Sequence, residues 1–197
     1  MKSVIFKYRG LLWGIFAISV FIFPAHPSLL RMVIAIPLMI AGQLLRFWAA
    51  GVIPKYRTLT LDAPLLVVWG PYAWMRNPLY AGNALLGCGW SLMAGWAWAP
   101  LFMLLFMVIY SLLIIPYEEQ FLLARFKGEY LRYKSETPGM FPSFSSFRRR
   151  LARSREGFDG KRSWFMERHS LRMNLLVTVL ILVRLFLFHT DSISIGR

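Results

Sequence analysis

The chain has 197 residues, of which 57% are hydrophobic and 16% are charged, whereas soluble domains carry about 25% charged residues. This composition argues against a soluble globular domain. Lysine and arginine number 23 against nine acidic residues, so the formal net charge is +14, which by itself would indicate a nucleic-acid-binding protein. The placement of the basic residues decides between a nucleic-acid partner and a membrane.

Apolar residues gather in stretches at about 11–23, 29–53, 79–95, 98–116 and 173–189. A membrane-spanning helix needs roughly 20 apolar residues, a length that the second stretch meets even with Arg31 and Arg46 near its ends, whereas the first and last are marginal. We therefore expect an all-α integral membrane protein with about five transmembrane helices.

The connections between these stretches differ in length and character. Lys2, Lys7 and Arg9 precede the first stretch, and residues 24–27 after it contain no small-x-small cleavage site, so we expect a retained helix rather than a removed signal peptide. Only two residues, Trp96 and Ala97, separate the third and fourth stretches. These stretches are expected to form a tight antiparallel hairpin.

The basic residues lie on one side of the expected membrane. Residues 1–10 and 54–76 carry three each and residues 117–172 carry thirteen, which places 19 of the 23 in three segments, while the connections 24–28 and 96–97 carry none. The positive-inside rule places these basic segments, and the N-terminus, in the cytoplasm. The net charge is thereby explained without a nucleic acid.

The cytoplasmic region after the fourth stretch divides into three parts. Tyr117–Glu136 has the spacing of an amphipathic helix at the membrane surface, and it ends before Pro138-Gly139. We expect a core of residues 1–142, a basic linker at 143–172 that adheres to anionic lipid, and a C-terminal hydrophobic helix and tail at 173–197.

Metal and disulfide chemistry is not expected. Cys88 is the only cysteine, and His26, His169 and His189 show no metal-ligand spacing. Gly87 and Gly89 flank Cys88 inside an apolar stretch, where small residues serve close contact between helices.

Polar residues gather at the expected cytoplasmic ends of the third and fourth stretches. Asn77 is expected to be the N-cap and Pro78 the first residue of the third helix. Glu118 and Glu119 follow the fourth helix, at the same membrane level as Tyr80 because the two helices form a hairpin. Adjacent helical residues point about 100° apart, so we expect one glutamate to face a pocket and the other to pair with Arg76 or Arg125.

The order of these motifs resembles a known family. It runs Gly70-Pro71-Tyr72, Arg76-Asn77-Pro78-Leu79-Tyr80-x-Gly82, Glu118-Glu119-x-x-Leu122 and Phe126-x-Gly128-x-Tyr130-x-x-Tyr133. The pattern is similar to that of the isoprenylcysteine carboxyl methyltransferases and phospholipid methyltransferases over residues 29–142. Asn77 stands where the eukaryotic pattern has histidine, so the resemblance implies no imidazole chemistry at this position.

The resemblance implies an integral-membrane methyltransferase that uses S-adenosylmethionine. A glutamate would bind the ammonium or ribose, Arg76 the carboxylate, and Tyr80 or Tyr130 the ring or sulfonium. The expected cofactor-binding residues are Gly70, Tyr72, Arg76, Asn77, Pro78, Tyr80, Glu118, Glu119 and Tyr130. The expected catalytic residues are Arg76, Asn77, Tyr80 and Arg46.

The methyl acceptor is expected to be a lipophilic molecule that enters from the bilayer, either an isoprenoid or prenyl-thioether carboxylate or a lipid headgroup. Membrane lipids are the other expected partners, and the bacterial inner membrane is the expected location. Arg46 would bind an acidic headgroup or anchor its helix at the membrane interface. Two other functional classes stay open on the sequence, an NADPH-dependent sterol-type reductase of related membrane fold and a non-enzymatic basic membrane scaffold.

Overall fold

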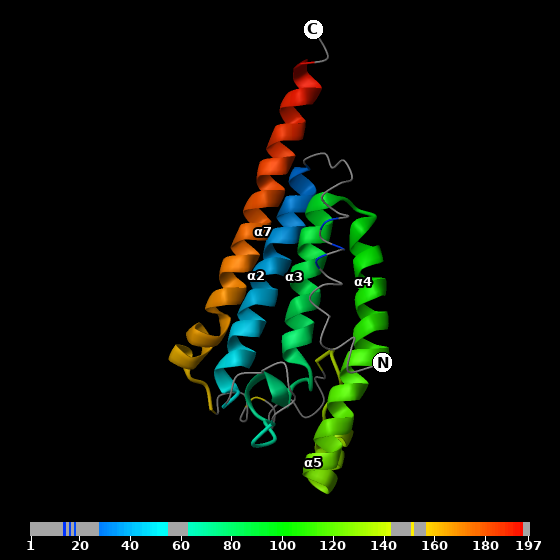
Figure 1. Cartoon of the computed structure of the whole chain (residues 1–197), viewed down its shortest axis with the longest axis vertical. Helices are drawn as coiled ribbons and strands as arrows, with labels where there is room; N and C mark the ends of the chain where they lie inside the picture. Colours follow the sequence, from blue (N-terminus) through cyan, green and yellow to red (C-terminus); the bar gives the residue numbers. More distant parts are fainter. Residues whose placement is uncertain are drawn as a thin grey trace.

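The computed structural model describes residues 28–54, 63–142 and 157–194, together with 14, 16, 18 and 151, and gives side-chain surroundings up to residue 185. The expected first helix at 11–23 and the linker residues 143–150 and 152–156 lie largely or wholly outside this part. Where the chain is described it is helical, without strands. Its elements are α2 (Leu29–Val52), η1 (Gly70–Ala73), α3 (Pro78–Ala94), α4 (Trp98–Ile109), η2 (Tyr110–Ile114), α5 (Ile115–Glu136) and α7 (Gly160–Ser194). The long helices α7, α2, α3 and α4 run side by side along the long axis (Figure 1).

Helices α2 and α3 pack closely because glycines face each other across their interface. A Cβ atom at Gly42 would lie 2.7 Å from the carbonyl oxygen of Gly82, and one at Gly82 would lie 2.8 Å from that of Gly42. Small residues allow such close approach of two helix backbones. Further along the same interface, a Cβ atom at Gly89 would meet Met39 at 2.4 Å, which agrees with the helix-contact role expected for this glycine.

The predicted hairpin between the third and fourth helices is confirmed. Helix α3 ends at Ala94 and α4 begins at Trp98, whose backbone N–H donates to the carbonyl of Gly95 at 3.2 Å. Helix α4 then continues through the π-helical turn η2 into α5. Such π-turns insert an extra residue into a helix and often occur at functional sites.

Helix α5 bends where the backbone of Lys127 adopts φ 47° and ψ −119°, a left-handed conformation that favours glycine. The predicted amphipathic helix at 117–136 is therefore confirmed in extent but is kinked. The part of α5 that carries Tyr130 and Tyr133 lies after this bend.

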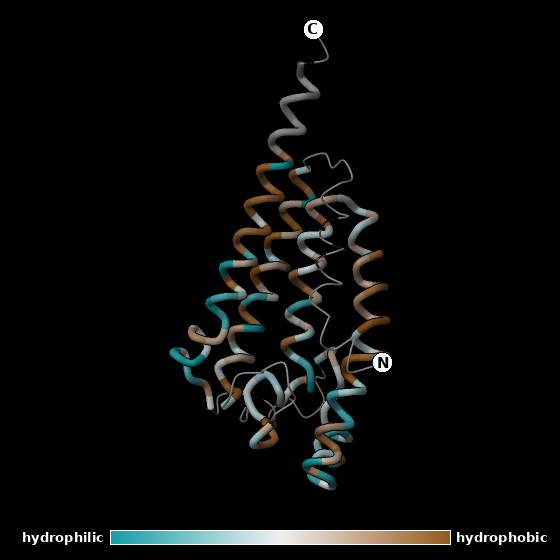
Figure 2. Tube along the Cα trace, in the orientation of Figure 1, coloured by the Kyte–Doolittle hydropathy of each residue, from teal (hydrophilic) through white to brown (hydrophobic). Residues whose placement is uncertain are grey.

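Two helices of the described part are long and apolar enough to cross a membrane, Leu29–Val52 and the continuous Trp98–Glu136. The expectation of about five such helices is thus supported for two. Helix α3, for instance, has 17 residues and is slightly short for a span. Hydrophobic residues predominate along much of α2, α4 and α7 (Figure 2). Several of their large apolar side chains are exposed, among them Ile36, Leu44, Leu104, Leu175 and Val183. Large apolar surfaces of this kind are typical of contact with lipid.

The C-terminal helix α7 begins at Gly160, within the segment expected to be a basic linker. Its start is capped by Asp159, whose Oδ1 accepts the backbone N–H groups of Lys161 at 2.9 Å and Arg162 at 3.1 Å. Ser163 and Glu167 are buried one turn apart, on the face that packs against α2. The basic side chains of this segment obscured that helical spacing, which is why the sequence suggested a linker.

Candidate active site

The loop before α3 is held against the chain segment that follows α5. The backbone N–H of Arg76 donates to the carbonyl of Pro138 at 2.9 Å, and that of Asn77 donates to the carbonyl of Gly139 at 3.0 Å. Tyr133 adds a third connection, because its hydroxyl donates to the backbone carbonyl of Tyr72 at 2.8 Å. Residues about 60 positions apart in the sequence therefore form one rigid end of the helical bundle.

Asn77 is the N-cap of α3 and Pro78 its first residue, as predicted. The Asn77 side chain makes no capping hydrogen bond; its Nδ2 donates to the carbonyl of Gly139 at 3.2 Å instead. Gly70 opens η1 with φ +59°, and a Cβ atom there would lie 2.7 Å from Val52. Both residues thus shape the loop before α3.

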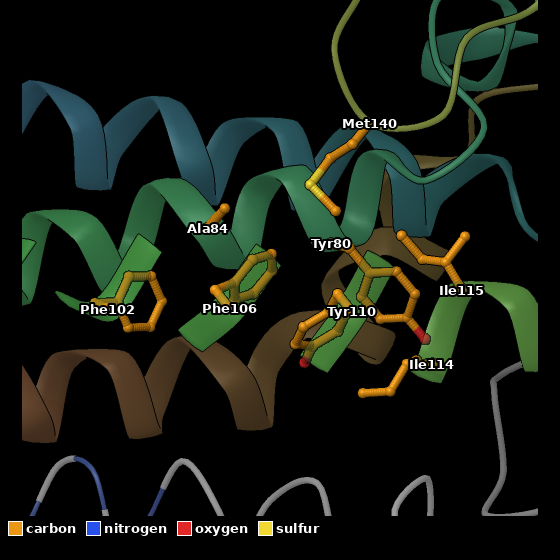
Figure 3. Packing of buried hydrophobic residues seen from close by; sticks show 8 residues of the cluster. All are labelled: Tyr80, Ala84, Phe102, Phe106, Tyr110, Ile114, Ile115 and Met140. Atoms are coloured by element: carbon orange, nitrogen blue, oxygen red, sulfur yellow. The ribbon is translucent and has the colours of Figure 1, made fainter. Parts of the chain in front are cut away.

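Glu118 lies in the first turn of α5 and is 6% exposed. The hydroxyl of Tyr80, from the first turn of α3, donates a hydrogen bond to its Oε1. The ring of Tyr80 also packs edge-on against Tyr110 of η2, with 4.7 Å between ring centroids. Figure 3 shows these two rings next to each other, in line with Phe106 and Phe102.

Glu119 forms a charged cluster with two basic residues. Arg76 reaches its Oε1 through Nε at 2.9 Å and Nη2 at 2.8 Å, and Lys134 reaches its Oε2 at 2.7 Å. The third guanidinium nitrogen of Arg76, Nη1, donates to the backbone carbonyls of Lys134, at 3.1 Å, and Thr137. Of the two partners expected for the second glutamate, the structure therefore has Arg76, while Arg125 lies over the ring of Phe126.

These groups surround a cavity of about 90 Å³ between the 63–67 loop, η1 and α5. Six of the expected site residues line it: Tyr72, Arg76, Asn77, Glu118, Glu119 and Tyr130. Both glutamates face it, whereas the sequence suggested one. The hydroxyl of Tyr130 is buried in its wall and has no hydrogen-bond partner of normal geometry within the described part of the chain.

The model of the phospholipid methyltransferase family matches residues 30–129, just over half of the chain. The chain belongs to the phospholipid methyltransferase family. The family resemblance read from the motifs is thereby confirmed, and the protein is a membrane methyltransferase by family. No curated protein and no solved structure matches the chain.

The match covers the part of the chain that builds the cavity, except the end of α5, and it excludes α7. Arg46 does not line the cavity. Its guanidinium pairs with Glu167 of α7, with Nε to Oε2 at 3.0 Å and Nη2 to Oε1 at 2.8 Å, and its Nη1 donates to Asn83. The structure thus separates Arg46 from the other expected site residues.

Sequence reasoning missed several polar residues that the structure places at or near the site. Lys134 lies within the predicted amphipathic helix, but its pairing with Glu119 follows the kink in α5. Glu167 and Asn174 lie beyond the family motifs. Their signal was a polar side chain within or beside an apolar stretch, which in a membrane protein marks a candidate functional site.

Proposed function

We propose that the protein transfers a methyl group from S-adenosylmethionine to a lipophilic acceptor that reaches the site from the bilayer. The observation that carries this proposal is the cavity in which Glu118, Glu119 and Tyr130 meet at one end of the bundle. S-adenosylmethionine supplies an electrophilic methyl group on a sulfonium, which an acceptor displaces in line. We place this end in the cytoplasm, because it contains the described parts of the basic segments 54–76 and 117–172, which the positive-inside rule assigns to that side. We take the membrane to be the bacterial inner membrane.

The residues around the cavity fit the chemistry of this donor. Two carboxylates lie beside each other on α5. Arg76 and Lys134 already neutralise Glu119, so the negative charge of Glu118 is the one that suits the ammonium or sulfonium group. The hydroxyl of Tyr130, buried close to Glu119 and Arg76, offers a further hydrogen bond. The aromatic side chains of Tyr72 and Tyr133 contribute apolar walls against which a purine ring can pack.

Arg76 acts here as a positioning residue. All three of its guanidinium nitrogens donate hydrogen bonds within the protein, to Glu119 and to the carbonyls of Lys134 and Thr137. Binding the donor carboxylate would cost some of these bonds. Arg76 instead holds Glu119 in place and ties the end of α5 to the loop before α3.

The cavity is smaller than the roughly 300 Å³ at which pockets for small molecules begin. At about 90 Å³ it accommodates part of a nucleoside-sized molecule. We infer that the wall formed by residues 63–67 shifts outward on binding.

Isothermal titration calorimetry of the purified full chain with S-adenosylhomocysteine tests the proposal. We expect saturable binding that Glu118→Gln and Glu119→Gln each weaken at least tenfold, while Glu136→Gln, in the exposed pair with Arg132, leaves it unchanged. Absence of binding, or binding that both site variants retain, overturns the proposal. NADPH serves as the negative control, and its binding in place of S-adenosylhomocysteine would also contradict it.

A further inference from the structure

A second, larger cavity of about 360 Å³ lies between α3, α4 and α7. Apolar side chains form most of its wall, namely Leu86, Trp90, Phe102, Phe106, Val177 and Ile181. The polar residues Asn83, Asn174 and Tyr110 lie toward the end nearer the cavity that Glu118 and Glu119 line, which we call the charged cavity. No charged side chain is among the described residues that line it.

A chain of hydrogen bonds behind this cavity fixes which way its two asparagine amides point. The guanidinium of Arg46 can only donate hydrogen bonds, so its partner on Asn83 is the acceptor Oδ1. The carboxylate of Glu167 can only accept hydrogen bonds, so the Nε2 of Gln43 donates to it, at 3.3 Å. Gln43 therefore presents its Oε1 to the Nδ2 of Asn174, at 2.6 Å.

The same network leaves two complementary groups for the cavity. Asn83 retains its Nδ2, a donor, and Asn174 retains its Oδ1, an acceptor. The charges of Arg46 and Glu167 neutralise each other within the network, and neither residue lines the cavity. From the two asparagines, a ligand at this end of the cavity meets one donor and one acceptor, and it meets no net charge.

Headgroups differ in how well they match this pair. A hydroxyl both donates and accepts, so it satisfies Asn174 and Asn83 at once. A phosphodiester only accepts and an ammonium only donates, so each leaves one amide unmatched. Each would also place a net charge in a cavity without a counter-ion, which is costly.

The dimensions favour one chain rather than two. Asn83 and Ser91, which both line the cavity on α3, are separated by eight residues, or about 12 Å of helix. The volume lies at the lower end of the range for small-molecule pockets, roughly 300–1,000 Å³. An extended single alkyl or prenyl chain fits such a narrow space along the helices.

We propose that this cavity binds a single-chain lipid with an uncharged hydroxyl headgroup, the hydroxyl lying between Asn83 and Asn174. The inference rests on the proposed function, for it names the class of the methyl acceptor. Tyr110 lines this cavity and contacts Tyr80, whose hydroxyl bonds to Glu118 in the charged cavity. The polar end of the lipid thus lies beside Tyr80 and Glu118. There the lipid oxygen would form a bond to the methyl carbon as the bond from methyl to sulfonium breaks, and the hydroxyl proton would pass to the Glu118 carboxylate.

The test compares three probes that share one chain and differ in headgroup: decanol, decylamine and decanoate. Each is titrated against the delipidated full-length protein and bound molecules are counted by native mass spectrometry. We expect decanol to bind several-fold more tightly than either charged probe. Tighter or equal binding of decylamine or decanoate overturns the proposal, and this comparison needs no variant.

Variants then locate the site. Asn83→Leu and Asn174→Leu should each weaken decanol binding about threefold to tenfold, the effect of one lost hydrogen bond. Ser163→Ala is the matched control, because it removes another contact of α7, to the carbonyl of Phe47, outside the cavity. Decanol binding that neither asparagine variant changes contradicts the assignment.

S-adenosylhomocysteine calorimetry on the same proteins separates this inference from the proposed function. Both asparagine variants should retain S-adenosylhomocysteine binding, because neither residue lines the charged cavity. A protein that binds decanol in this way but not S-adenosylhomocysteine contradicts the proposed function alone. The reverse result contradicts only the acceptor class.

Discussion

The hydroxyl of Tyr80 on α3 donates a hydrogen bond to the carboxylate of Glu118 on α5, and both residues are almost fully buried. Tyr80 also contacts Tyr110, which lines the apolar cavity, while Glu118 lines the charged one. The Tyr80–Glu118 pair therefore joins the two halves of the proposed site.

Replacing Tyr80 with phenylalanine should destabilise the protein and weaken donor binding. The ring contact with Tyr110 is retained, but a buried carboxylate loses one donor, a loss worth about 1.5–3 kcal/mol for a bond to a charged group. Thermal unfolding in detergent and S-adenosylhomocysteine calorimetry measure the two effects. An unchanged unfolding temperature would show that the bond contributes nothing to stability.

Tyr130→Phe should have the opposite effect on stability. Its buried hydroxyl has no partner of normal geometry among the described residues, so removing it relieves a desolvated polar group and leaves the unfolding temperature equal or higher. If the hydroxyl binds the donor, S-adenosylhomocysteine affinity should fall about threefold to tenfold. A fall in both stability and affinity would assign Tyr130 a structural role.

Glu119→Gln should lower stability far more than Glu136→Gln. Glu119 is 12% exposed and holds both Arg76 and Lys134, whereas the Arg132–Glu136 pair has side chains 83% and 41% exposed. Exposed pairs contribute roughly 0–1 kcal/mol, but removing one member of a largely buried pair costs up to about 3–5 kcal/mol. Thermal unfolding of the two variants gives the comparison, and equal losses would refute it.

Several features could be predicted because they depend on local sequence. The apolar run at 29–53 predicts α2 to within one residue, and Asn77-Pro78 marks the start of α3 because proline suits the first helical turn. The hairpin follows from the two-residue connection. The proximity of Tyr80 to the glutamates then follows from the hairpin, since the start of α3 and the start of α5 lie at the same end of the bundle.

Other features depend on contacts that no local pattern encodes. Arg46 and Glu167 are separated by 121 positions, so their pairing depends on how α7 is rotated against α2. The same applies to Asn77, whose side chain leaves its expected capping role for the carbonyl of Gly139. In both cases a distant partner satisfies the polar side chain. Arg46 was expected to bind a lipid headgroup, and Asn77 was expected to cap the start of its helix.

Gly42→Ala should weaken the packing of α2 against α3. The new methyl carbon would lie 2.7 Å from the carbonyl oxygen of Gly82, which is backbone and cannot rotate away, so the helices must separate and the overpacking costs about 1–3 kcal/mol. Because Arg46 and Asn83 meet across this interface, decanol binding should fall as well. Gly128→Ala is the matched control: a Cβ atom there meets nothing within 4 Å, so stability should stay equal or rise by about 0.4–1 kcal/mol. Thermal unfolding of both variants decides the point, and a Gly42→Ala protein as stable as the unaltered chain would disprove the close contact between α2 and α3.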